Sequence, residues 1–163
     1  MRKRLIIFVL MCAMIVGMLP TLAYAAQPTE PKNIDGVYQI ASAENLQWFQ
    51  QQVKSGRTAI NAALTANIDL TSIEAWSAIP AYAGTFDGRG YTISNLHISN
   101  ATVAKQGLFA ELSKDGIVRN LGIKSSNVSM TTSKKINNAN AAILVGYNSG
   151  TILNCYVVGS SVT

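Results

Sequence analysis

Three segments of the chain share one pattern: Ile93-Ser94-Asn95-Leu96-His97-Ile98, Val118-Arg119-Asn120-Leu121-Gly122-Ile123 and Ile152-Leu153-Asn154-Cys155-Tyr156-Val157. Each copy reads aliphatic residue, any residue, asparagine, apolar residue, any residue, aliphatic residue. The second asparagine lies 25 residues after the first, and the third lies 34 residues after the second. Periods of ~20 to 50 residues are typical of solenoids, in which each repeat stacks on the next. The three segments are therefore expected to lie directly on top of one another.

Stacking these segments predicts three columns of apolar side chains inside the molecule, because a single coil buries too little surface to be stable alone. The predicted columns are Ile93, Val118 and Ile152, then Leu96, Leu121 and Cys155, then Ile98, Ile123 and Val157. The asparagines are expected at bends, where each amide can bond to the backbone or to the next amide in the stack. The positions that accept any residue are expected to point outward, and they hold His97, Arg119, Gly122 and Tyr156.

A second element repeats with a displacement of 35 residues. Residues 108–112 correspond to residues 143–147, and the glycine-bearing turns at Gly116 and Gly150 follow. Thr and Val favour extended segments, whereas Asn and Gly allow the bends between them. Each coil is therefore predicted to contain a strand, a glycine turn, a second strand, an asparagine bend and a third strand, which makes the fold class all-β.

The part before the repeats predicts one strand and one helix. Residues 36–40 alternate like a short strand, and Ser42 is a candidate N-cap for a helix over residues 43–53. Leu46, Phe49 and Val53 would share one face of that helix, and Gly56 would end it. We expect the helix to cap the stack, residues 34–163 to form one domain, and residues 26–33 to form a flexible lead-in.

The first 25 residues indicate export. Three basic residues at positions 2–4 precede an apolar run over residues 5–19, and Ala23-Tyr24-Ala25 is a small-x-small cleavage site. The alternative is a retained membrane anchor, but the run of 15 residues is shorter than the ~20 that a spanning helix needs, and Pro20 interrupts it. We predict a signal peptide over residues 1–25 and a protein that is secreted or held at the cell surface.

Composition argues against several other classes of protein. Residues 26–163 hold 13 Asn, 14 Ser and 11 Thr, and regularly placed aliphatic residues among them argue against a disordered tail. The whole chain has 13 basic and 8 acidic residues, but three of the basic ones lie in the signal peptide, so a nucleic-acid partner is not supported. Cys155 is the one cysteine after the signal peptide, which excludes an intramolecular disulfide there.

One set of segments spans most of the chain after the signal peptide: 35–40, the helix with Leu46, Trp48 and Phe49, 64–70, 84–93, 107–109 and 146–156. In these segments the chain resembles the bacterial surface proteins that carry GLUG repeats. Ala110 and Ala141-Ala142 depart from the pattern, since they stand where glycines are usual. The resemblance implies a right-handed parallel β-helix with degenerate repeats and a structural or adhesive role without catalysis, in which a glycan or a surface protein would be the ligand.

An enzyme that acts on polysaccharides is the alternative, because β-helices also host lyases and glycosidases. Such chemistry usually needs paired carboxylates, and the acids here are scattered. Asp87 and Asp115 precede glycines in turns, Asp69 lies in a strand, and Glu74 follows it in a loop. Residues 87–90 are interpreted as a hairpin-like turn, since the lysine and helix of a phosphate-binding loop do not follow. We therefore predict no enzyme activity and no catalytic residue.

Metal and cofactor chemistry is not predicted either. His97 is the one histidine and occupies an outward position without a second ligand, and Cys155 is expected to be a buried, unreactive thiol in a leucine column. Trp48 is expected to pack from the helix onto the first coil. Tyr82, in a loop, and Tyr156, in an outward position, are the aromatic residues where a glycan would be sought first.

The last residues predict an open coil. Residues 157–163 read as a strand without a cap, and uncapped solenoids expose unpaired backbone and apolar columns. We therefore expect either further repeats beyond Thr163 or end-to-end association at this coil.

Overall fold

The computed structural model describes residues 27–99, 104–130 and 139–163, and in them the chain is mostly β with one N-terminal helix. The signal peptide predicted over residues 1–25 lies outside the described residues. The elements are β1 (Lys32–Ile34), β2 (Val37–Ile40), α2 (Ala43–Lys54), β3 (Asn61–Leu64), β4 (Ile68–Asp69), β5 (Thr85–Asp87), β6 (Thr92–Ser94), β7 (His97–Ser99), β8 (Lys105–Gln106), β9 (Phe109–Leu112), β10 (Ile117–Arg119), β11 (Gly122–Lys124), β12 (Asn127–Ser129), β13 (Asn140–Ala141), β14 (Val145–Asn148), β15 (Thr151–Leu153), β16 (Tyr156–Val158) and β17 (Ser161–Val162).

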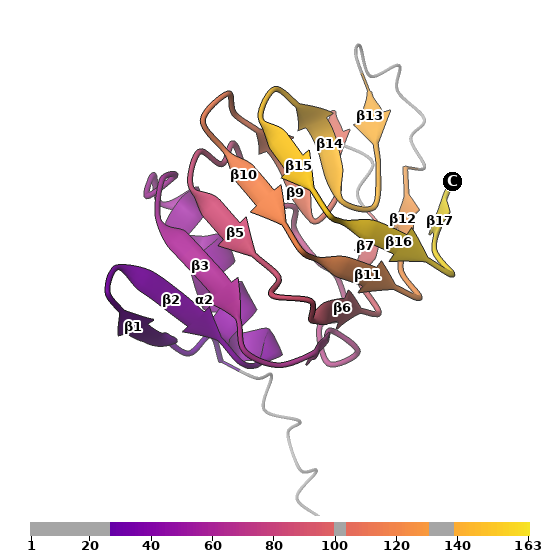
Figure 1. The fold of residues 1–163 in the computed structure, drawn as a ribbon. Helices are drawn as coiled ribbons and strands as arrows, with labels where there is room; N and C mark the ends of the chain where they lie inside the picture. Colours follow the sequence, from indigo (N-terminus) through magenta and orange to yellow (C-terminus); the bar gives the residue numbers. More distant parts are fainter. Residues whose placement is uncertain (1–26, 100–103, 131–138) are drawn as a thin grey trace, which may run out of the picture.

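The short strands stack in four layers. Layer 1 holds β3 and β4, layer 2 holds β5 to β9, layer 3 holds β10 to β14, and layer 4 holds β15 to β17. Every pairing between layers is parallel, and corresponding strands form shared sheets, such as β3-β5-β10-β15 (Figure 1). A second shared sheet has the order β4-β6-β11-β16. Each layer therefore repeats the course of the one before it, as the sequence repeats predict.

The N-terminal end is closed by β1, β2 and α2. β1 pairs with β2 in antiparallel register through a turn at Asp35 and Gly36, both with positive φ, and β2 then pairs with β3 in parallel. The helix begins at the predicted N-cap: the Ser42 side chain accepts a hydrogen bond from the Asn45 N–H at 3.3 Å. Thr29 in the expected lead-in also donates from its N–H to the Glu44 carbonyl. The predicted strand and helix are confirmed.

The register of the stack differs from the sequence-based alignment. Val118 pairs with Ile152 as predicted, but its partner in layer 2 is Phe86, not Ile93. Ile93 instead pairs with Ile123, which pairs with Val157. The corrected columns are Phe86, Val118 and Ile152; Ile68, Ile93, Ile123 and Val157; and Ile98, Val128 and Val162.

The misalignment arises because each layer has two bends that need a left-handed backbone. Asn120 and Asn154 have positive φ at the first bend, where the Asn154 amide donates to the Asn120 side-chain oxygen at 3.4 Å. Asn95 also has positive φ, but it lies at the second bend, where Ser125 and Gly159 are its counterparts. Asparagine tolerates this conformation at either bend, so the residue type alone does not distinguish them.

Two further predictions are corrected, one about the register of a repeated strand and one about a turn. Val145 pairs with Phe109, so the second repeated element is displaced by one residue more than predicted. Residues 87–90 do not form a hairpin-like turn, because β5 and β6 belong to different sheets and do not pair with each other. The two residues of positive φ there, Arg89 and Gly90, turn the chain from one sheet to the next.

Aromatic rings fill the core between the helix and the second layer. Phe49 of α2 contacts Tyr82 and Phe86, and Phe109 of β9 stacks on Tyr82 with ring centroids 5.3 Å apart. Tyr82 is fully buried and its hydroxyl donates to the Ile60 carbonyl at 2.8 Å, so burial raises its pKa well above the usual range. The expectation of Tyr82 as an accessible glycan contact is therefore wrong, because this ring is part of the core.

The last layer is less covered than the others. Its exposed apolar side chains are 39 to 56% exposed. Three of them, Ile152, Val157 and Val162, continue interior columns whose members in layers 2 and 3 are fully buried. The exposed group consists of Ile152, Leu153, Tyr156, Val157, Val158 and Val162. No helix in the described part of the chain is long and apolar enough to cross a membrane.

Candidate functional site

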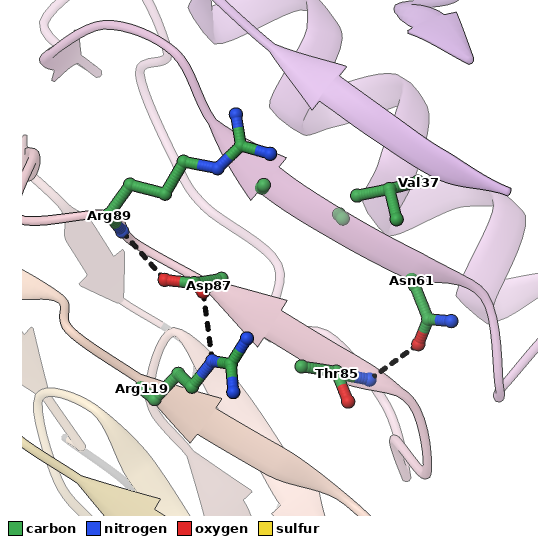
Figure 2. A pocket seen from close by; sticks show the side chains of 8 residues that line it. Val37, Asn61, Thr85, Asp87, Arg89 and Arg119 are labelled. Carbon is green, nitrogen blue, oxygen red and sulfur yellow. Dashed lines mark hydrogen bonds and ion pairs between the residues drawn. The ribbon is translucent and has the colours of Figure 1, made fainter. Parts of the chain in front are cut away.

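A cavity of about 210 Å³ lies on the outer face of the six-stranded sheet, over β2, β3, β5 and β10 (Figure 2). Its floor is formed by Ala62 and Ala63 of β3. The hollow follows from register, because Ala63 is paired with Gln39 on one side and Asp87 on the other. A short side chain between two longer ones leaves a depression in the sheet surface.

The two ends of the cavity differ in character. Val37, Asn61 and Thr85 border one end, where the Asn61 side-chain oxygen accepts the Thr85 N–H at 2.9 Å (Figure 2). No residue in the described ranges accepts a hydrogen bond from the Asn61 amide nitrogen, which therefore has donors to offer a ligand. Asp87, Arg89 and Arg119 border the other end.

Asp87 organises the charged end. Its Oδ1 accepts the Arg89 N–H at 2.8 Å and the Asn120 amide at 3.1 Å, while its Oδ2 accepts Arg119 Nε at 2.8 Å. Partial burial raises the pKa of this carboxyl, but the hydrogen bonds from Arg89, Asn120 and Arg119 outweigh it, and the pKa is lowered overall. Asp87 is therefore ionised at neutral pH and fixes Arg119 beside the cavity.

The second arginine, Arg89, is held by a residue of β2. Arg89 donates from one terminal nitrogen to Gln39 Oε1 at 2.9 Å, so its side chain reaches from the end of β5 across β3 to β2. Figure 2 shows Arg89 and Arg119 on either side of Asp87. The site thus combines two fixed cations and one anion, a set that can bind an anionic group but has no second carboxylate to support acid–base chemistry.

Replacing Asp87 by Asn should lower stability in a pH-dependent way. Because the folded pKa of Asp87 is lowered, its contribution is fully present above the ordinary Asp pKa of ~4 and is lost as pH falls through the folded pKa. We expect urea unfolding at pH 7 to show a loss of about 1 kcal/mol, and the difference between the two proteins to shrink below pH ~4. The control is Asp115→Asn, which should have little effect because Asp115 pairs with Lys114 at an exposed position.

Asp69 holds a backbone bend, whereas Asp115 forms an ion pair with Lys114 at the surface. Asp69 Oδ1 accepts the Asn95 amide at 2.9 Å, the Thr71 hydroxyl at 2.6 Å and the Thr71 N–H at 2.9 Å, and these hydrogen bonds lower the pKa of Asp69. Asp115 bonds only to Lys114. Among residues 27–99, 104–130 and 139–163, no three His, Cys, Asp or Glu residues are grouped as metal ligands would be.

The remaining candidates lie away from the cavity or inside the fold. His97 is exposed on β7, as expected for an outward position. Cys155 is half-buried, and burial raises the pKa of its thiol. Trp48 packs against Tyr38 with ring centroids 4.9 Å apart, as expected for a helix residue on the first strands. Tyr156 is exposed and lies against the Gly122 backbone.

The sequence-based reasoning missed the pairing of Asp87 with Arg119. It assigned Asp87 to its turn, which is correct for the bond to the Arg89 N–H, but it did not place β5 beside β10. The signal that could have found the pair is the alternative alignment of residues 85–87 with residues 117–119, which brings both charged residues to the same outward position.

Comparison with known proteins gives a partial match. No family model and no solved structure matches the chain. The curated protein halomucin of Haloquadratum walsbyi is 32% identical over 80 residues. These residues make up 49% of this chain but 1% of halomucin, so the chain spans a very small part of that relative's length.

Proposed function

We propose that this chain is an exported, non-catalytic module of a cell-surface protein, built as a right-handed parallel β-helix of the GLUG-repeat type. The observation that carries the proposal is the parallel stacking of corresponding strands through four layers, closed at one end by a helix. Such stacks present long, rigid outer faces, which suit binding or spacing at a surface. GLUG membership rests on the sequence resemblance alone.

The match to halomucin supports a modular role. A segment that corresponds to half of this chain is a minute part of halomucin, which fits a unit that is used within much longer chains. The polar, weakly charged composition of residues 26–163 agrees with an extracellular setting.

Two of the acids in the described residues, Asp69 and Asp87, do not favour the enzyme alternative. Asp69 and Asp87 are each engaged by several hydrogen-bond donors that hold bends or neighbouring layers together. A general acid needs a raised pKa, whereas both of these pKa values are lowered.

A polysaccharide panel tests the proposal. The secreted protein is incubated with immobilised neutral and acidic polysaccharides, with and without calcium, and both retention and the release of new chain ends are measured. We expect retention on at least one polymer without new ends. Release of ends that depends on the protein would establish the enzyme alternative instead. Export is measured separately from the N-terminus of the secreted protein, which we expect at Ala26.

End-to-end association of two copies is a further part of the proposal. The outer side of layer 4 carries partly exposed aliphatic residues, and residues 151–163 contain no charged side chain that would oppose edge pairing. The opposite end is covered by α2 and β1, so two copies would meet through their last layers. Sedimentation should show a concentration-dependent dimer that is abolished in the Val158→Lys variant. A wild-type protein that remains monomeric at high concentration would contradict this.

A further inference from the structure

The arginines at the charged end of the cavity have more N–H donors than the protein has acceptors bonded to them. Arg119 uses only Nε, toward Asp87, and no residue in the described part of the chain accepts a hydrogen bond from its two terminal nitrogens. Arg89 uses one terminal nitrogen toward Gln39. The Asn61 amide adds two further donors at the other end, since its oxygen is occupied by Thr85. The cavity is therefore rich in unused donors.

The charge of the site indicates what these donors would bind. Two guanidinium groups and one carboxylate leave a single positive charge around the cavity. Asp87 keeps its negative charge at neutral pH because its pKa is lowered, and it fixes the guanidinium of Arg119 in one orientation. A guanidinium that is fixed in this way matches a planar or tetrahedral oxyanion better than a mobile lysine does. The complement is one singly charged oxyanion.

The position of the cavity argues against a peptide strand as the ligand. Peptides that add to a sheet need a free edge with unpaired backbone groups. Here β3 is paired with both β2 and β5, and β5 is also paired with β10, so the backbone below the cavity is already used. A ligand must be recognised by side chains from above. The volume of about 210 Å³ is below the ~300 Å³ of the smallest drug-sized sites, which fits one unit of a polymer.

From this geometry we propose that the cavity between Arg89, Arg119 and Asn61 binds the acidic group of a saccharide unit, a carboxylate or a sulfate ester. The arginines hold the oxyanion, the Asn61 amide and Thr85 hydroxyl bond to ring hydroxyls, and Val37 contacts the apolar face of the ring. This inference rests on the proposed surface function and names the ligand class for it. The neighbouring sugars of the polymer would continue along the open sheet face.

Titration of the secreted chain with defined oligosaccharides tests the inference. The probes are a trimer of galacturonate, the neutral galactose trimer of the same length, a sulfated galactose trimer and triglutamate. Amide chemical shifts report both the affinity and the place of binding. We expect one or both acidic trimers to shift β3, β5 and β10 resonances, and the neutral trimer and triglutamate to bind at least tenfold more weakly. The comparison of the two acidic trimers identifies which oxyanion is preferred.

Variants separate this site from general charge attraction. Arg119→Gln should weaken binding of the preferred acidic trimer by about tenfold or more, and Arg89→Gln should weaken it as well. Lys114→Gln removes the same charge from an exposed site away from the cavity and should leave the affinity unchanged. Circular dichroism and unfolding curves confirm that each variant remains folded, and Arg119→Lys tests whether charge alone is sufficient.

Two results would overturn the inference. One is acidic-trimer binding that is equal in wild type, Arg89→Gln and Arg119→Gln, which would leave the surface-module proposal standing but place the ligand elsewhere. The other is arginine-dependent binding of triglutamate as tight as that of the sugars, which would make the ligand an acidic peptide. Cleavage of a trimer would be a different result, because it would contradict the proposed non-catalytic function rather than the location of the binding site.

Discussion

The Gly116→Ala variant is expected to lose about 3 kcal/mol of unfolding free energy, a large part of the stability of a domain of this size. A Cβ at Gly116 would lie 2.5 Å from the Tyr82 carbonyl oxygen and 2.5 Å from Leu112 Cδ1. Gly116 is stacked between Gly84 of the layer below and Gly150 of the layer above, and these two positions also face backbone oxygens of the preceding layer. Because backbone cannot move aside locally, the methyl group must push two layers apart.

The control for this variant is Gly159→Asn. Gly159 has a φ of 58° and no atom within 4 Å of an added Cβ, and its counterpart in layer 2 is an asparagine with positive φ. Its substitution should change the urea midpoint only slightly. If Gly116→Ala unfolds at the same urea concentration as the wild type, the close stacking at this corner is wrong.

The Phe109→Ala variant is expected to lose about 4 kcal/mol, and the protein should be largely unfolded at moderate temperature. Phe109 is fully buried, and its ring centroid lies 5.3 Å from that of Tyr82 and 5.5 Å from that of Phe86. Removal of the ring leaves a cavity beside the rings of Tyr82 and Phe86. Thermal unfolding followed by circular dichroism measures the loss.

Tyr147→Ala is the matched control for Phe109→Ala. Tyr147 lies on β14, which pairs with β9, but its side chain is 46% exposed and contacts the Lys105 ammonium at 4.4 Å from the ring centroid. We expect its removal to cost no more than about 1 kcal/mol. Equal losses in the two variants would show that Phe109 is not the centre of the core.

Local sequence patterns predicted the individual elements well. The helix face with Leu46, Phe49 and Val53 is buried, and the N-cap at Ser42 is present, because both depend on neighbours within one or two helical turns. The parallel pairing of Val118 with Ile152 was also predicted correctly.

The stacking of layer 2 on layer 3 could not be predicted from asparagine spacing. Asn95 and Asn120 meet the same need for a left-handed backbone, but they do so at different corners of the layer. The glycines at positions 84 and 116, which face the preceding layer, identify the correct register better, because no other residue fits there. When repeats differ in length, their register is therefore predicted better from positions where only glycine fits, together with positions that need a positive φ, than from the latter alone.

The candidate site was missed for the same reason. Asp87 and Arg119 are adjacent only in the observed register, in which β5 lies beside β10. In the sequence-based register, Arg119 would lie beside Ser94, and its charge would have no partner. The buried position of Tyr82 could not be predicted either, because Tyr82 forms an isolated bridge with Leu112 outside any strand, and such a bridge has no periodic sequence pattern.

Disulfide trapping tests the layered register most directly. In a background with Cys12→Ser and Cys155→Ser, the pair Ser94→Cys and Lys124→Cys joins register partners on β6 and β11. Neighbouring strands lie ~4.8 Å apart, within the ~4.4 to 6.8 Å between Cα atoms that disulfides accept. The comparison pair is Ser94→Cys with Arg119→Cys, which lie in different sheets. Oxidation should cross-link the first pair nearly completely and leave the second reduced, as measured by mass spectrometry. Cross-linking of the second pair without the first would contradict the stacking of β6 on β11.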